Sequence, residues 1–162
     1  MQMYGYGYVV RMAQTAITAA KTLIQIKAGA ASPVDVTEAY VAQVTKTSSE
    51  LLEIQHIQYT GSPTGGTVTS FTPLPLCPGD PAAKAVGGTS STGVNATAEP
   101  SGGTANIIGG GVMNILNGEW TRVPIPEGRI RIQVSQFYGL KLFTAPAASM
   151  TLLAYVVFAE VQ

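Results

Sequence analysis

Charge is scarce in this sequence of 162 residues. Nine lysines and arginines balance nine aspartates and glutamates, so only 11% of the residues are charged, against about 25% in an average soluble domain. A neutral chain of this kind lacks the electrostatic footprint of a nucleic-acid binder and the polybasic segment of a membrane-surface protein. No apolar run reaches the ~20 residues of a membrane helix. We therefore predict neither a nucleic-acid nor a membrane partner.

Residues that carry chemistry are equally few. Cys77 is the only cysteine, His56 is the only histidine, and Asp35 and Asp80 are the only aspartates. One cysteine excludes a disulfide framework and a cysteine zinc cluster, and we expect Cys77 to be a buried or half-buried thiol. His56 lies inside an expected strand, and no partner for it can be inferred from spacing. We predict no catalytic residue, no cofactor and no metal. A hydrolase that uses His56 is the weakest of three functional hypotheses.

Strand signals recur along most of the chain. The clearest period of two covers residues 129–135, where Ile130, Ile132 and Val134 are expected to face the core. The other expected strands are residues 22–27, 36–47, 51–59, 67–72, 120–125 and 150–161. The last of these is apolar on both faces, which indicates a central strand or one covered by a neighbouring subunit. Short strands with turn residues between them predict an all-β fold, an antiparallel β-sandwich or jelly roll.

Two segments are expected to depart from the regular β pattern. Residues 1–15 are predicted to form an N-terminal arm, because glycines alternate there with Tyr4, Tyr6 and Tyr8. The arm lies on a neighbouring subunit in one interpretation and is a floppy terminus in the other, and residues 11–20 favour a short helix. Residues 79–111 are rich in glycine, threonine and serine and are expected to form one long loop. Residues 16–162, with this loop, form a single predicted domain. The first residues lack the basic and apolar segments of a secretory signal, which predicts synthesis in a cytoplasm.

An uncharged surface favours association with other chains, so we expect a homo-oligomer. The candidate contact residues are Tyr4, Tyr6, Tyr8, Arg11, Trp120, Arg129 and Arg131. Arg129 and Arg131 share one strand face. This face either contacts an anionic group, or is solvated or lies between subunits. Trp120 either packs in the core or an interface, or stacks on a sugar ring. The second use defines the alternative functional hypothesis, a glycan-binding β-sandwich.

Three segments resemble small virion proteins of tailed bacteriophages. They are residues 20–29, residues 71–85, and residues 139–142 with the turn at 145–148. Within that group the chain is most similar to the capsid decoration (cement) proteins. The resemblance implies a β-sandwich or jelly-roll body, a trimer, and a position on the capsid exterior that clamps neighbouring subunits of the major capsid protein. The leading hypothesis is therefore a non-enzymatic structural protein of the virion.

Overall fold

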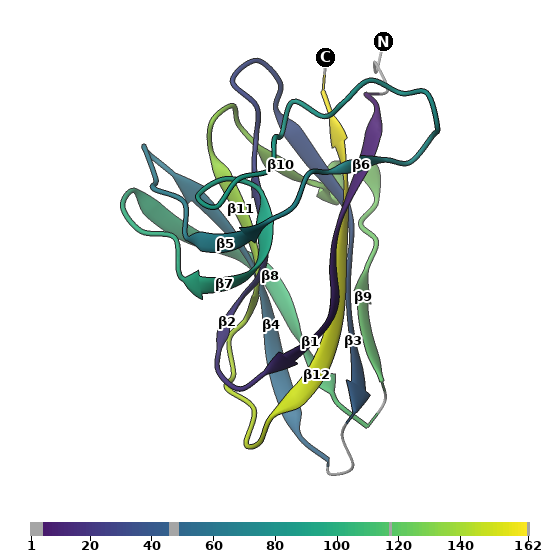
Figure 1. Ribbon diagram of the computed structural model, residues 1–162, viewed down its shortest axis with the longest axis vertical. Coiled ribbons are helices and arrows are strands. Elements are labelled where there is room, and N and C mark those ends of the chain that lie inside the picture. Colours follow the sequence, from purple (N-terminus) through teal and green to yellow (C-terminus); the bar gives the residue numbers. More distant parts are fainter. Residues whose placement is uncertain (1–4, 46–48, 117, 162) are drawn as a thin grey trace.

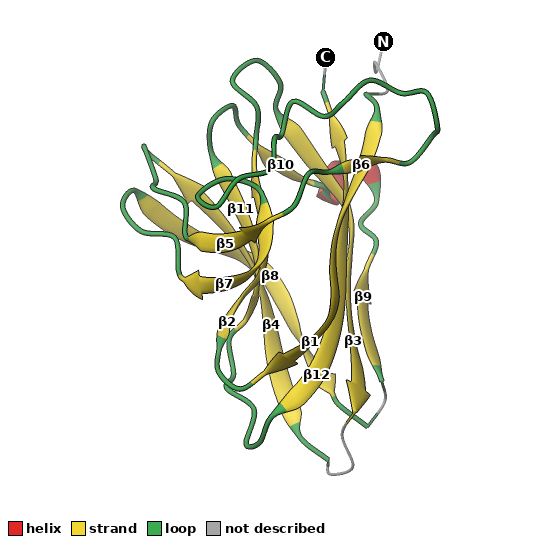
Figure 2. Cartoon of the chain, in the orientation of Figure 1, coloured by secondary structure: helices red, strands yellow, loops and turns green. Residues whose placement is uncertain are grey.

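Two antiparallel β-sheets pack face to face (Figure 1). The computed structural model describes residues 5–45, 49–116 and 118–161. Within these residues, the helical content is one short 3-10 turn, η1, at Pro126–Gly128 (Figure 2), and no helix is long and apolar enough to cross a membrane. The predicted all-β sandwich is confirmed, whereas the jelly-roll variant stays a prediction.

The first sheet is built around the C-terminal strand. Its order is β10 (Ile130–Ile132), β3 (Val34–Thr45), β12 (Met150–Glu160), β1 (Gly7–Ile17) and β6 (Leu74–Pro75), and β9 (Glu119–Arg122) also pairs with β3. Val156 of β12 lies opposite Val10 on one side and Ala39 on the other. The expectation of a central strand near the C-terminus is therefore confirmed.

The second sheet has the order β5 (Thr67–Ser70), β7 (Gly93–Ala98), β2 (Lys21–Lys27), β11 (Phe137–Leu142), β4 (Leu51–Thr60) and β8 (Thr104–Asn114). β11 is its centre and pairs with β2 and β4 over its whole length. β8 forms one edge and pairs with β4.

The core lies between the sheets and follows from strand alternation. Every second residue of β12 is at most 1% exposed from Met150 to Phe158. These side chains meet Ile24, Leu140 and other buried residues of the second sheet in one continuous apolar cluster. Full burial of a methionine, leucine, valine or phenylalanine side chain among them stabilises the fold by roughly 1.5–3 kcal/mol.

The predicted N-terminal arm is wrong from residue 7 onward. Residues 7–17 form β1, an interior strand of the first sheet, and the expected helix over residues 11–20 does not form. Tyr8, Val10 and Met12 are buried in the core. β1 has strand alternation in its buried residues, and pairing with β12 satisfies its backbone, so tertiary contacts override the helix preference of its alanine, methionine and glutamine residues.

The predicted loop over residues 79–111 is wrong in its second part, which contains β7 and most of β8. Polar side chains attach the first part to the sheets. The Gln25 side chain donates to the Ser91 carbonyl and accepts from the Gly66 amide. The buried carboxylate of Glu160 accepts a hydrogen bond from the Ala85 amide at 2.8 Å. The segment is therefore packed on its own domain over much of its length.

Two smaller expectations also fail. Val134 is 41% exposed and does not face the core as Ile130 and Ile132 do. The reason is that β10 ends at Ile132, and the chain turns through Ser135, whose φ is +61°. Cys77 is exposed.

Candidate functional site

The outer side of the first sheet carries apolar side chains that no described segment of the chain covers. Outward-facing residues of β12 are flanked by those of β1 and β3. We call this surface the β12 face and define it by Val9, Arg11, Tyr40, Ala42, Leu153, Tyr155 and Val157. Arg11 is exposed and the other six are half-buried. Sheet neighbours already cover the flanks of these side chains, so that only their tips are exposed. Two carboxylates border the face, because Glu38 lies opposite Val157 and Glu119 lies opposite Ala42.

Two stacked tyrosines lie in the middle of the β12 face. The rings of Tyr40 and Tyr155 are 4.8 Å apart between centroids, with an angle of 12° between their planes. The Tyr155 hydroxyl donates to Glu38 at 2.5 Å, and the Tyr40 hydroxyl donates to Glu119 at 3.0 Å. These bonds to carboxylates raise the pKa of Tyr155 to about 12 and also raise the pKa of Tyr40. The two tyrosines therefore stay protonated, and their hydroxyls remain hydrogen-bonded to the carboxylates of Glu38 and Glu119.

The tyrosines predicted to form a contact arm differ in their exposure to solvent. Tyr4 lies outside the described residues. Tyr6 is 40% exposed, and Tyr8 is 1% exposed. The Tyr8 hydroxyl donates to the Pro81 carbonyl at 3.0 Å, and its ring packs on Phe158. The prediction of Tyr8 as an interface residue is wrong, because its side chain lies inside the sandwich and anchors the segment that contains Pro81.

The three predicted arginines lie in different surroundings. Arg11 lies on the β12 face, opposite Tyr155. Arg131 binds both carboxylate oxygens of Asp35 through Nε and a terminal nitrogen, each at 2.7 Å. Arg129 is half-buried, and its Nε atom is buried without a hydrogen-bond partner. Of these three residues, Arg11 alone belongs to the candidate surface.

Trp120 packs against the core. Its ring lies 5.3 Å from that of His56 between centroids. Residue Gly111 makes this packing possible, since a Cβ atom there would lie 2.5 Å from the indole nitrogen of Trp120. Of the interpretations of Trp120, core packing is the one that the contacts show.

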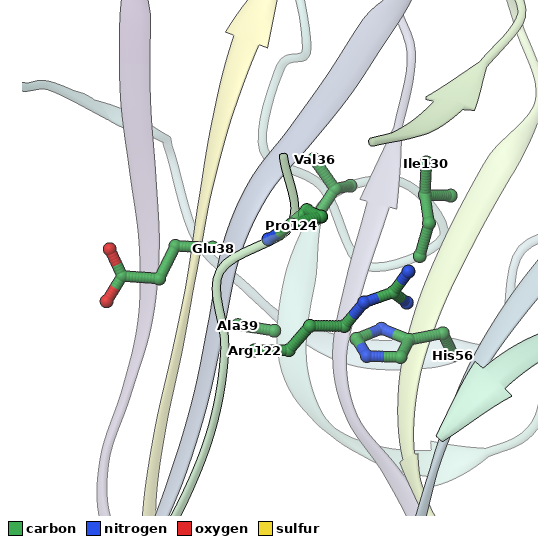
Figure 3. Close-up of a pocket in the computed structure, with 7 residues that line it drawn as sticks. All are labelled: Val36, Glu38, Ala39, His56, Arg122, Pro124 and Ile130. Carbon is green, nitrogen blue, oxygen red and sulfur yellow. The ribbon is translucent and has the colours of Figure 1, made fainter. Parts of the chain in front are cut away.

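His56 is the centre of a buried polar cluster. The ring is fully buried, and its Nδ1 atom forms a hydrogen bond of 2.6 Å with the hydroxyl of buried Tyr138. The Arg122 guanidinium lies beside the imidazole, in a small crevice that Val36 and Ile130 also line (Figure 3). The Nε2 atom of His56 and one terminal nitrogen of Arg122 are buried without hydrogen-bond partners.

Electrostatics keeps this cluster in fixed protonation states. Burial, with a smaller contribution from Arg122, lowers the pKa of His56 to about 3. Burial raises the pKa of Tyr138. His56 is therefore neutral at physiological pH. A substrate would have to enter the sandwich to reach it, and the geometry is that of a buried structural histidine.

The residues at the centre of the candidate surface were missed by sequence reasoning. Tyr40, Tyr155 and Leu153 were not among the predicted contacts, although β12 had been recognised as apolar on both faces. That pattern was the available signal, since the outward half of a two-sided apolar strand is exposed unless something covers it. Among the described residues, no three of the His, Cys, Asp and Glu side chains gather as metal ligands would.

Comparisons with protein families, with curated proteins and with solved structures found no match to this chain.

Proposed function

We propose that this chain is a structural protein of a tailed-phage particle, which binds the capsid lattice through the β12 face. The observation that carries the proposal is the apolar outward row of β12, where Leu153, Tyr155 and Val157 stay half-exposed at the centre of a sheet. A buried apolar centre is typical of lasting interfaces between proteins. The resemblance to capsid decoration proteins supplies the partner, the major capsid protein.

The proposed role is stabilisation and not turnover. A protein that binds the assembled lattice but not free capsid subunits shifts the equilibrium toward the assembled form by mass action. The β12 face suits this role because β12 is central and its backbone groups are paired on both sides. The face is therefore formed before binding, and docking orders little additional chain.

The proposal is tested with a charge placed in the middle of the face. Leu153→Lys puts an ammonium group on the half-buried outward row, opposite Ala42. We expect it to weaken co-sedimentation with empty capsid shells of the phage that encodes this chain by more than about tenfold, because the charge must be desolvated on binding.

A matched variant separates loss of the interface from a general effect of added charge. Val123 is 67% exposed and lies outside the strands, so Val123→Lys should bind the shells as the unmodified protein does. Equal shell binding by Leu153→Lys and the unmodified protein would refute the role of the β12 face. Absence of shell binding by the unmodified protein would refute the proposed function itself.

A further inference from the structure

β8 is the longest edge strand in the described structure. It has 11 residues and pairs with β4 alone among the described strands. Its sequence contains no charged residue and no proline. Apolar side chains on it are well exposed, with Ile107 and Val112 each at 61%. An edge of this kind presents unpaired backbone donors and acceptors together with apolar area, which makes it a template for another strand.

The other edges of the two sheets are protected in the usual ways. β5, β6, β9 and β10 have four, two, four and three residues. β6 ends at Pro75, and the middle residue of β10 is Arg131. Short length, proline and charge are the devices by which proteins block edge-to-edge pairing. Their absence from β8 makes this edge different from the rest.

The β8 backbone divides into two parts. Its register against β4 shifts between Ile107 and Gly109, so Ile108 forms a bulge. Residues 109–114 then stay in continuous register with β4. On the inner side, Arg122 and Trp120 lie against Gly109 and Gly111. The outer side and the free edge of residues 109–114 are left for a partner strand.

We propose that β8 pairs in antiparallel fashion with β8 of a second copy of this chain, across a twofold axis at Gly111. This pairing places Val112 of each copy opposite Gly110 of the other on the outer side of the joined sheet, so that a branched side chain lies over a position without one. Because β8 has no charge, a twofold axis brings no like charges together. A second, equally uncharged copy of β8 therefore suits this edge better than a charged strand would.

The length of the paired segment limits the affinity of one copy for the other. Residues 109–113, the in-register part of β8 that is centred on Gly111, span about 17 Å of extended strand. The contact is smaller than the roughly 1,600 Å² of a standard interface. We expect micromolar or weaker association of the free protein. The pairing becomes stronger when both copies are held on one lattice, through their high effective concentration. The pairing of free copies does not depend on the proposed function.

Sedimentation velocity of the full chain tests the pairing, from a few micromolar to several hundred micromolar. A reducing agent is included because Cys77 is exposed. We expect a monomer–dimer equilibrium that Val112→Lys shifts toward monomer by at least about tenfold, and that Val123→Lys leaves unchanged. Leu153→Lys, which alters the β12 face, should dimerise normally.

Hydrogen exchange supplies a second measurement. Within residues 109–113, the amides that point away from β4 should exchange more slowly at high than at low protein concentration, and this difference should disappear in Val112→Lys. A monomer at every concentration would overturn the proposal. So would a trimer, or any oligomer that persists in Val112→Lys. Shell binding by a chain that never dimerises would refute the pairing and leave the proposed function intact.

Discussion

Acidification should destabilise this protein through one histidine. The neutral form of His56 is buried against Arg122, Trp120 and Tyr138. Its pKa is about 3 in the folded chain and about 6.5 in an unfolded chain. The unfolded state therefore binds a proton that the folded state excludes, and stability falls as the pH drops from about 6.5 toward 3. Between pH 8 and pH 5 the linkage relation gives a loss of about 2 kcal/mol.

The assay is urea unfolding at a series of pH values, followed by the fluorescence of Trp120, the only tryptophan. The interval from pH 8 to pH 5 lies above the ordinary pKa values of aspartate and glutamate, so His56 dominates it. His56→Gln cannot titrate, and its free energy of unfolding should change little over this interval. Equal stability of the unmodified protein at both pH values, or the same decline in His56→Gln, would show that His56 does not cause the loss.

Two further predictions concern packing. Tyr8→Phe removes the hydroxyl that donates to the Pro81 carbonyl, and it should lower the free energy of unfolding by about 1 kcal/mol and speed proteolysis near Pro81; an unchanged cleavage rate would contradict the anchoring role. Gly111→Ala brings a methyl group against the Trp120 indole and should cost about 1–3 kcal/mol, whereas Gly128→Ala, where contacts are ordinary, should change the melting temperature little. Equal effects of the two glycine variants would show that the Trp120 contact does not constrain Gly111.

The alternation of apolar and polar residues predicted the class of the fold, because this alternation is visible in each short stretch of sequence. β12 shows why this works: apolar residues on both faces of a strand indicate a central position, and β12 has a neighbouring strand on each side. β1 shows where it fails. Tyr8, Val10 and Met12 do alternate, but tyrosine–glycine repeats before them and helix-favouring residues after them hide the pattern. Its strand form depends on β12, more than 130 residues away in sequence.

β8 was missed for a different physical reason. Its centre is Gly109-Gly110-Gly111, and glycine has a low preference for strands. The structure shows that two of these glycines make room for the Arg122 and Trp120 side chains. No property of the triplet itself indicates that a tryptophan lies against it, so sequence reasoning assigned a loop.

The candidate surface could be predicted only in part. The two-sided apolar character of β12 was visible in the sequence, whereas the pairing of Tyr40 with Tyr155 depends on the register between strands 115 positions apart. The seven predicted contacts depend on local sequence, such as the tyrosine–glycine repeat and the strand face shared by Arg129 and Arg131. Residue type alone does not distinguish Arg11, which lies on the β12 face, from Tyr8, which lies inside the core.

We propose that other polypeptides cover the β12 face when the protein works. Hydroxyl-radical footprinting of Leu153 and Tyr155 tests it most directly, with the free protein compared to the same protein in intact phage particles. We expect oxidation of both side chains to fall sharply in the particle, while the exposed side chain of Val123 stays as reactive as before. Equal oxidation of Leu153 and Tyr155 in the free and particle-bound protein would show that nothing covers the β12 face in the particle.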